Sequence, residues 1–231
     1  RRTESSTTRG SASTCGSAVL AKRVICLLTL SRGQLVRTKN FRIDRWYSLE
    51  AFEFKGADEI VVVDVTPEGP DRAATAATIE RLLSAAFIPV TLGGRLRTLD
   101  DAKWAFDHGA DKVLSSDRAF IEAAARQYGD QAAVWGMTFG RNDQDPAPEH
   151  MGEMLCQNVD LDGSLAGYGL HDLNTQIPVV IGSGCGNWQH MVDAFHAGAD
   201  GCATSNVLHF SEAALASCKN YLKDHGIMVR A

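Results

Sequence analysis

The sequence lacks several features that would place a protein in a class at once. Its 6 cysteines include no C-x-x-C pair, and its 7 histidines include no H-E-x-x-H zinc motif. No segment reaches the roughly 18 consecutive apolar residues of a membrane-spanning helix. We therefore expect no metal site, no cofactor and no membrane segment.

Positive charge is also scarce. The formal net charge is −5 and the lysines and arginines form no basic stripe, so nucleic acid is not an expected partner. A small anion would need a local binding site. The cysteines are scattered through apolar segments as small hydrophobic residues are, which favours a reducing, cytoplasmic compartment.

The first 20 residues contain little that could build a core. Residues 1–20 are rich in Ser, Thr, Gly and Arg, and Glu4 is their single acid. This composition predicts a disordered tail or tag. Because the segment is acid-poor and rich in Arg and Ser, it is also compatible with an organellar transit peptide. We expect the folded domain to cover residues 21–231.

An internal repeat is the strongest signal in the chain. Residues 89–117 and 178–206 align without gaps at a constant offset of 89 residues, and both contain Gly-Ala-Asp, at 109–111 and 198–200. A unit of this size contains several secondary-structure elements, unlike a solenoid repeat. The repeat therefore predicts two related halves.

Apolar runs of strand length alternate with amphipathic helical patterns from Lys22 onward. We expect strands over residues 23–30, 59–65, 89–93, 112–115, 132–139, 153–160, 178–182 and 201–205, and helices over 71–87, 98–109, 118–129, 187–198 and 211–226. The strand runs are continuously apolar, as in parallel strands buried on both faces. Together with the repeat, this alternation predicts an α/β fold, a (β/α)8 TIM barrel built from two half-barrels.

Three connections are too short for the usual barrel helix: those after the first, fifth and sixth strands. Residues 139–152 link the fifth and sixth strands and include two prolines, while 169–176 precede the seventh. A parallel crossover normally needs about a dozen residues or more. We expect truncated helices there, so the barrel has lost cover on that side or a partner supplies it.

Two glycine-rich turns occupy equivalent places in the repeat. The first cradle (92–95 with 115–117) contains Gly93, Gly94 and Ser116; the second cradle (182–186 with 204–206) contains Gly182, Ser183, Gly184, Ser205 and Asn206. Turns after barrel strands that lead into helices present backbone N–H groups to phosphate. Glycines there are also common in plain tight turns, but their repetition favours a ligand with a phosphate at each end.

A series of segments then carries a family resemblance. In order, they are AKRVICLL, RGQLV, TKNF, GADEIVVVDVT, IPVTLGG, GADKV, VDLDGSLAGYG, IPVVIGSGCG, AFHAGADG and YLKDHGIMVR. Together they resemble the cyclase subunit of imidazole glycerol phosphate synthase, a family of histidine biosynthesis. The resemblance extends over nearly all of residues 21–231.

The resemblance implies a reaction, a partner and residue roles. Family members use ammonia from a glutaminase partner at the amino-terminal face of the barrel to close an imidazole ring on a doubly phosphorylated substrate, and they release aminoimidazole carboxamide ribotide. By position, the cradles match the phosphate loops, and Asp64, Asp162 and Gly163 match the substrate groove. Arg23, Glu59, Lys112 and Glu153 match a charged ammonia gate. From the residues alone, these four charges also fit a purely structural ring of ion pairs.

The chain departs from the family at the catalytic positions. The family's two aspartates, near the ends of the first and fifth strands, are Thr29 and Thr138 here. A neutral hydroxyl cannot replace a carboxylate in acid–base work, which contributes roughly 10²–10⁴-fold to a rate. Arg95 also replaces the third glycine of the first cradle, where it could either bind a phosphate bidentately or block the pocket.

Three functions therefore remain open. The first is a cyclase-type amidotransferase subunit with impaired turnover, or a relative tied to amidation of surface-polysaccharide sugars. The second is a non-catalytic barrel that binds a phosphorylated ligand and a glutaminase partner. The third is a phosphosugar isomerase, which would need aspartates where Thr29 and Thr138 stand. His171 beside Asp172 could in principle replace a lost base.

Overall fold

The computed structural model describes residues 20–47, 56–69, 71–85, 87–139, 141, 145–169, 173, 175–205, 207 and 215–230. Eight parallel strands form a closed barrel. They are β1 (Arg23–Ser31), β4 (Glu59–Asp64), β5 (Val90–Gly93), β6 (Lys112–Ser115), β7 (Ala133–Phe139), β8 (Glu153–Asn158), β9 (Val179–Ile181) and β10 (Gly201–Thr204). The sheet closes because β10 pairs with the first half of β1, from Arg23 to Cys26. The predicted (β/α)8 barrel is confirmed.

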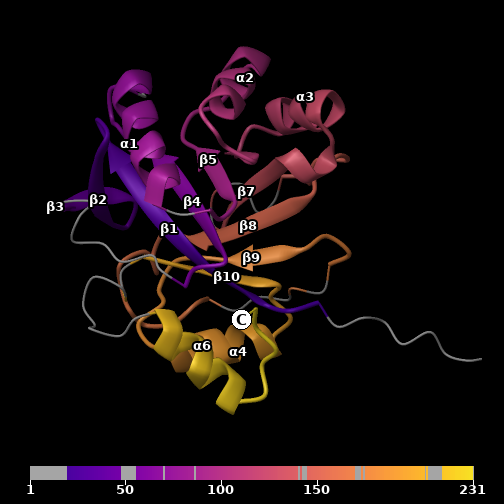
Figure 1. Cartoon of the computed structure of the whole chain (residues 1–231). Helices are drawn as coiled ribbons and strands as arrows, with labels where there is room; N and C mark the ends of the chain where they lie inside the picture. Colours follow the sequence, from indigo (N-terminus) through magenta and orange to yellow (C-terminus); the bar gives the residue numbers. More distant parts are fainter. Residues whose placement is uncertain are drawn as a thin grey trace, which may run out of the picture.

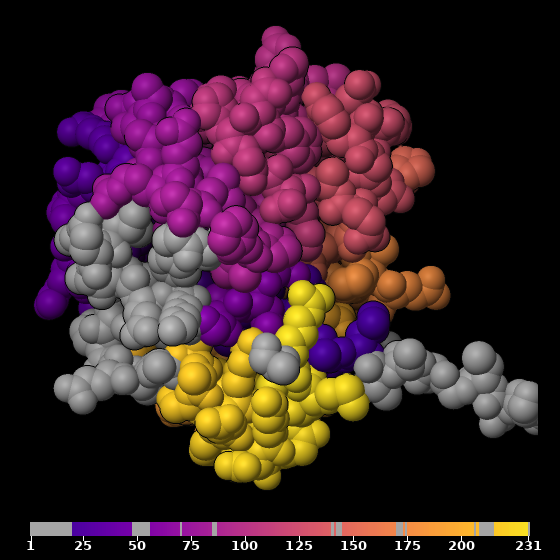
Figure 2. Space-filling model, in the orientation of Figure 1, coloured from indigo at the N-terminus to yellow at the C-terminus, as the bar shows by residue number. Residues whose placement is uncertain are grey.

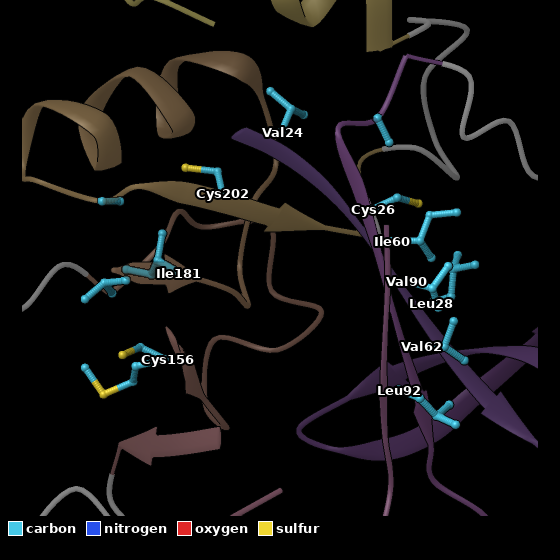
Figure 3. Packing of buried hydrophobic residues seen from close by; sticks show 14 of the residues in the cluster. Val24, Cys26, Leu28, Ile60, Val62, Val90, Leu92, Cys156, Ile181 and Cys202 are labelled. Carbon is cyan, nitrogen blue, oxygen red and sulfur yellow. The ribbon is translucent and has the colours of Figure 1, made fainter. Parts of the chain in front are cut away.

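Successive side chains of each strand alternate between the barrel interior and the surrounding helices. The interior cluster comprises Ile25, Leu27, Val61, Leu114, Val134, Leu155, Val180 and Ala203. The outer cluster packs the strands against the helices, and Figure 3 shows side chains of β1, β4 and β5 gathered in it, among them Leu28, Ile60 and Leu92. Both strand faces are therefore buried, which explains the continuous apolar runs.

In the described part of the chain, five α-helices cover the outside of the barrel. They are α1 (Arg72–Ala85), α2 (Leu99–Asp107), α3 (Arg118–Tyr128), α4 (Trp188–His196) and α6 (Leu215–Asp224), with a short 3-10 turn, η2 (Asp130–Ala132), before β7. Figure 1 shows α1, α2 and α3 as one group and α4 with α6 on the opposite side of the barrel. None of these described helices is long and apolar enough to span a bilayer.

The duplication is visible in the element boundaries. Helices α2 and α4 begin at residues 99 and 188 and end at 107 and 196, while β6 and β10 begin at 112 and 201. Each pair keeps the offset of 89 residues found in the sequence. The two halves therefore share one strand–helix–strand plan.

Loop residues replace the missing helices. The described residues between β7 and β8, and between β8 and β9, contain no α-helix. Met151, Tyr168 and Leu173 from these segments are nevertheless buried in the outer cluster. Irregular chain thus supplies part of the cover over β7, β8 and β9.

A β-hairpin after β1 was missed from the sequence. Strands β2 (Gln34–Lys39) and β3 (Arg42–Tyr47) form an antiparallel extension of the barrel. Strand β2 pairs with the end of β1 from Thr29 to Ser31. The hairpin therefore stands at the carboxyl-terminal end of the strands, beside the barrel mouth.

The two ends of the described chain meet at the opposite end of the barrel. In Figure 2 the first described residues, in indigo, lie against the yellow carboxyl-terminal segment. The backbone N–H of Lys22 donates to the carbonyl of Met228 at 2.7 Å. The five described cysteines are all buried and unpaired by disulfides, as the sequence predicted, while Cys15 lies outside the described residues.

Candidate functional site

Strand alternation decides which side chains reach the barrel mouth. On β1 the inward positions run from Arg23 at the amino-terminal end through Ile25 and Leu27 to Thr29. On β7 the same alternation takes Val134 through Gly136 to Thr138. Thr29 and Thr138 therefore both point into the mouth, where the predicted catalytic positions belong.

The described residues form three adjoining cavities at the mouth. A cavity of about 420 Å³ borders the first cradle, and one of about 30 Å³ borders the second. A central cavity of about 280 Å³ shares Phe41, Arg95 and Arg141 with the first. It shares Thr29, Thr38 and Asp162 with the second. The two cradles therefore open onto one continuous mouth.

The first cradle is wide and lined by cations. Gly94 and Ser116 line its cavity together with the guanidinium-bearing residues Arg95, Arg97 and Arg141. Arg95 donates to the carbonyl of Pro67 at 3.0 Å, so its side chain lies along the rim. Gly93 packs instead against the interior, where an added Cβ would be 3.0 Å from a methyl carbon of Leu114.

The second cradle is narrow and partly buried. Ser183, Gly184 and Ser205 line its cavity. The Ser183 side chain is buried, and its hydroxyl has no hydrogen-bond partner among the described residues. Gly182 does not line the cavity and packs against Gln157 of β8. Asn206 lies outside the described residues, as do His171 and Asp172.

Asp64 is committed to structural hydrogen bonds. One carboxylate oxygen accepts from the N–H and the hydroxyl of Thr66, at 2.9 and 2.6 Å. The other accepts from the hydroxyl of Thr75 on α1 at 2.7 Å. Asp64 belongs to the outward-facing side of β4, so its carboxylate ties the strand end to α1 although the residue borders the central cavity.

Asp162 lies between the second cradle and the central cavity. Its Oδ2 accepts the backbone N–H of Phe41 at 3.0 Å. Burial raises the pKa of its carboxyl group, against the opposing effects of that hydrogen bond, a hydrogen bond from Thr38 and the positive charge of Arg37. Neighbouring Gly163 serves packing, because a Cβ there would lie 2.8 Å from the carbonyl oxygen of Thr38.

The β2–β3 hairpin supplies mouth residues that the sequence analysis missed. Asn40 and Phe41 at its turn both have positive φ. The N–H of Asn40 donates to the carbonyl of Asp162, and the guanidinium of Arg141 lies 5.3 Å from the centre of the Phe41 ring. Asn40, a residue type that tolerates positive φ in turns, was the available turn signal.

The four gate candidates form a closed ring of ion pairs at the other end of the barrel. Arg23 donates to Glu59 at 2.9 Å and also to Glu153. Lys112 donates to Glu59 at 3.3 Å and to Glu153 at 3.1 Å. The pairing predicted from their alternating sign is thus present.

The ring shifts the pKa values of its members. Burial alone would raise the pKa of Glu59, but the charges and hydrogen bonds of Arg23 and Lys112 outweigh it and lower the pKa. Burial alone would lower the pKa of Arg23, but its two carboxylate partners outweigh it and raise the pKa. All four ring residues line a surface depression of about 630 Å³.

Comparison with known sequences fits this geometry. The family model described as "Histidine biosynthesis protein" matches residues 23–145 and 144–214. A protein of Campylobacter concisus named imidazole glycerol phosphate synthase subunit HisF is 30% identical over 91% of this chain and 98% of its own length. Proteins of the same name from Chlorobium limicola and Streptococcus mutans are 31% and 30% identical over 92% of this chain and their full lengths.

Proposed function

The chain belongs to the histidine biosynthesis protein family, and on that premise we propose that it is the barrel subunit of an imidazole glycerol phosphate synthase-type enzyme. Its substrate is a small molecule with a phosphate at each end. Ammonia, supplied by a glutaminase, closes the imidazole ring at the barrel mouth. This reaction class follows from the resemblance and from the names of the relatives.

The observation that carries the proposal is the pair of cradles in one mouth. The central cavity borders both, so a single elongated ligand could span them. The buried Ser183 hydroxyl has no hydrogen-bond partner among the described residues, and a buried hydroxyl left unpaired costs about 1 to 3 kcal/mol. A phosphate oxygen in the second cradle would satisfy it.

The charged ring supports the proposed partner. It lies at the amino-terminal end of the strands, and Thr29 lies six residues further along β1 than Arg23, about 20 Å at 3.3 Å per residue. The interior between them is lined by the apolar cluster, which offers no proton to a neutral ammonia molecule. A glutaminase docked over the depression around the ring would deliver ammonia along this axis.

Turnover is slower than in relatives with two aspartates, because Thr29 and Thr138 hold those positions. The Thr29 hydroxyl donates to the carbonyl of Val36 at 2.5 Å, so it is already engaged in the hairpin. This observation also favours a second candidate, a non-catalytic barrel that binds a phosphorylated ligand and a glutaminase partner. A homologue acting on polysaccharide sugars would share the altered position in the first strand, Thr29.

An ammonia-dependent assay with the doubly phosphorylated family substrate separates the candidates. We expect slow turnover by the wild-type chain and binding of the same substrate by calorimetry. The double variant Thr29→Asp/Thr138→Asp should turn over faster, by up to roughly 10²–10⁴-fold. Binding without turnover would favour the non-catalytic barrel, and absence of binding would overturn both.

A further inference from the structure

Three carboxylates border the mouth cavities, and the structure separates them by their commitments. Asp117 caps helix α3 by accepting the N–H of Phe120. Asp64 accepts three hydrogen bonds from Thr66 and Thr75. These hydrogen bonds commit the Asp117 carboxylate to the start of α3 and the Asp64 carboxylate to the connection between β4 and α1, so neither is directed at a ligand.

Asp162 differs in place and in environment. It borders both the central cavity and the second cradle, next to Thr29 in each. Its donors among the described residues are the N–H of Phe41 and the hydroxyl of Thr38, which leaves lone pairs for a ligand because two carboxylate oxygens offer about four acceptor sites. Its carboxyl group therefore borders the cavities next to Thr29, the position at which the family has an aspartate.

We propose that Asp162 is the catalytic acid–base residue of this chain, in place of the two missing aspartates. The proposal rests on the proposed function. The Asp162 carboxylate accepts one proton from the ammonia-derived nitrogen as the ring-closing C–N bond forms. It donates that proton to the amine nitrogen of the leaving group as the C–N bond to that nitrogen breaks, so the residue returns to its starting state.

The surroundings fit a residue that changes its protonation state. A raised pKa brings a carboxyl group closer to neutrality, where proton transfer in both directions is efficient. The charged and titratable groups around the two cavities that contain Asp162 are Arg37 of β2, Asp64 of β4, Arg95 after β5, Arg141 after β7 and Cys185 after β9. The positive charge of Arg37 lowers the pKa of Asp162, but burial outweighs it.

A purely structural role for Asp162 makes a different prediction. The carboxylate also holds the hairpin turn through the N–H of Phe41, so loss of that contact could loosen the mouth. Asp162→Asn keeps an acceptor oxygen for this N–H but cannot take up a proton, whereas Asp162→Ala loses both. The two variants therefore separate proton transfer from hairpin anchoring.

The test is ammonia-dependent turnover of the wild-type chain, Asp162→Asn and Asp162→Ala, measured across pH with substrate affinity from calorimetry. We expect kcat to fall by roughly 10²–10⁴-fold in both variants with substrate affinity unchanged in Asp162→Asn. The wild-type rate should rise with pH as Asp162 loses its proton, and this acidic limb should be absent in Asp162→Asn.

Two outcomes would overturn the inference and are distinguishable. If Asp162→Asn keeps the wild-type kcat and acidic limb while Asp162→Ala alone is impaired, Asp162 only anchors the hairpin, and the proposed function stands. If the wild-type chain itself shows no ammonia-dependent turnover, the catalytic form of the proposed function fails together with the inference.

Discussion

Gly94 shows at residue scale how tightly the first cradle is built. Its φ is +109°, and an added Cβ would lie 2.4 Å from the carbonyl oxygen of Asp64. We expect Gly94→Ala to lower the free energy of unfolding by about 1 to 3 kcal/mol from backbone strain, and further because of the clash. Urea-induced unfolding measures the total loss.

Gly129 provides the matched control for that substitution. Its φ is +93°, and an added Cβ would meet no atom within 4 Å, so Gly129→Ala carries the backbone strain alone. If both variants lose the same free energy of unfolding, the backbone of the first cradle can move away from β4 to accommodate the added methyl group without further loss of stability.

Ser183 tests the second cradle at the same scale. Ser183→Ala removes a buried hydroxyl that has no partner in the described part of the chain, so stability without ligand should stay equal or rise. A hydrogen bond to a charged group contributes about 1.5 to 3 kcal/mol, and affinity for the doubly phosphorylated substrate should therefore fall about tenfold or more. Calorimetry and urea unfolding give the two quantities.

Ser84 on α1 is a suitable control, since its exposed hydroxyl donates to the carbonyl of Arg81 and the residue borders none of the mouth cavities. Ser84→Ala should leave substrate affinity unchanged. If Ser183→Ala lowers stability and leaves affinity intact, its hydroxyl has a structural role and the second cradle does not bind phosphate through it.

Residue roles were only partly predictable from sequence. The resemblance identified Arg23, Glu59, Lys112 and Glu153, and their alternating charges at strand starts predicted that they pair. The difference between Asp64 and Asp162 could not be predicted, because one ends a barrel strand, the other closely follows one, and both are acids. Only side-chain direction and the donors on α1 and on the hairpin distinguish the two.

At element scale, a buried ion pair fastens helix α6 to the barrel. Lys219 Nζ lies 2.7 Å from Asp58 Oδ1, and Asp58 Oδ2 accepts the N–H of Val24. Lys219→Met leaves the Asp58 carboxylate buried and unpaired, so we expect unfolding free energy to fall by about 3 to 5 kcal/mol. The midpoint of urea unfolding reports this change.

Lys103 is the matched exposed lysine, because it pairs with Asp107 on the surface of α2. Exposed pairs contribute little, so Lys103→Met should leave the midpoint almost unchanged. A similarly small effect of Lys219→Met would mean that solvent reaches Asp58 and that the pair does not fasten α6.

The strands and helices were easier to predict than the connections. Parallel strands buried on both faces leave long apolar runs, and all eight barrel strands fall within the predicted ranges or within one residue of them. The β2–β3 hairpin escaped because its outer strand is exposed and carries no apolar alternation. The loops that pack over β7 to β9 do so through single buried residues such as Met151. Isolated buried residues produce no periodic pattern in the sequence, so this packing could not be predicted.

At the scale of the whole molecule, an apolar interior separates the charged ring at one end of the barrel from the two cradles at the other. The ring of four charges closes the amino-terminal end, and the cradles lie at the other. The interior cluster between them comes from alternate residues of most of the barrel strands. The same alternation of side chains along the strands therefore places the charged ring, the apolar interior and the mouth residues along the barrel axis.

The ring should also make the free energy of unfolding depend on pH in the acidic range. The pKa of Glu59 is lowered in the folded chain from an ordinary value of 4.5, so the unfolded chain binds a proton more readily. Its contribution to stability is therefore fully present above about pH 4.5 and is lost as the pH falls through the folded-state pKa. We expect Glu59→Gln to flatten the decline of urea midpoints below pH 4.5.

Glu80→Gln, which alters an exposed carboxylate of α1, is the control and should keep the wild-type decline. Glu59→Gln should lower stability at neutral pH, because Arg23 and Lys112 then share the single carboxylate Glu153. A Glu59→Gln chain with wild-type acid sensitivity would place the acid-labile groups elsewhere. The ring would then not be a determinant of the stability of the closed barrel.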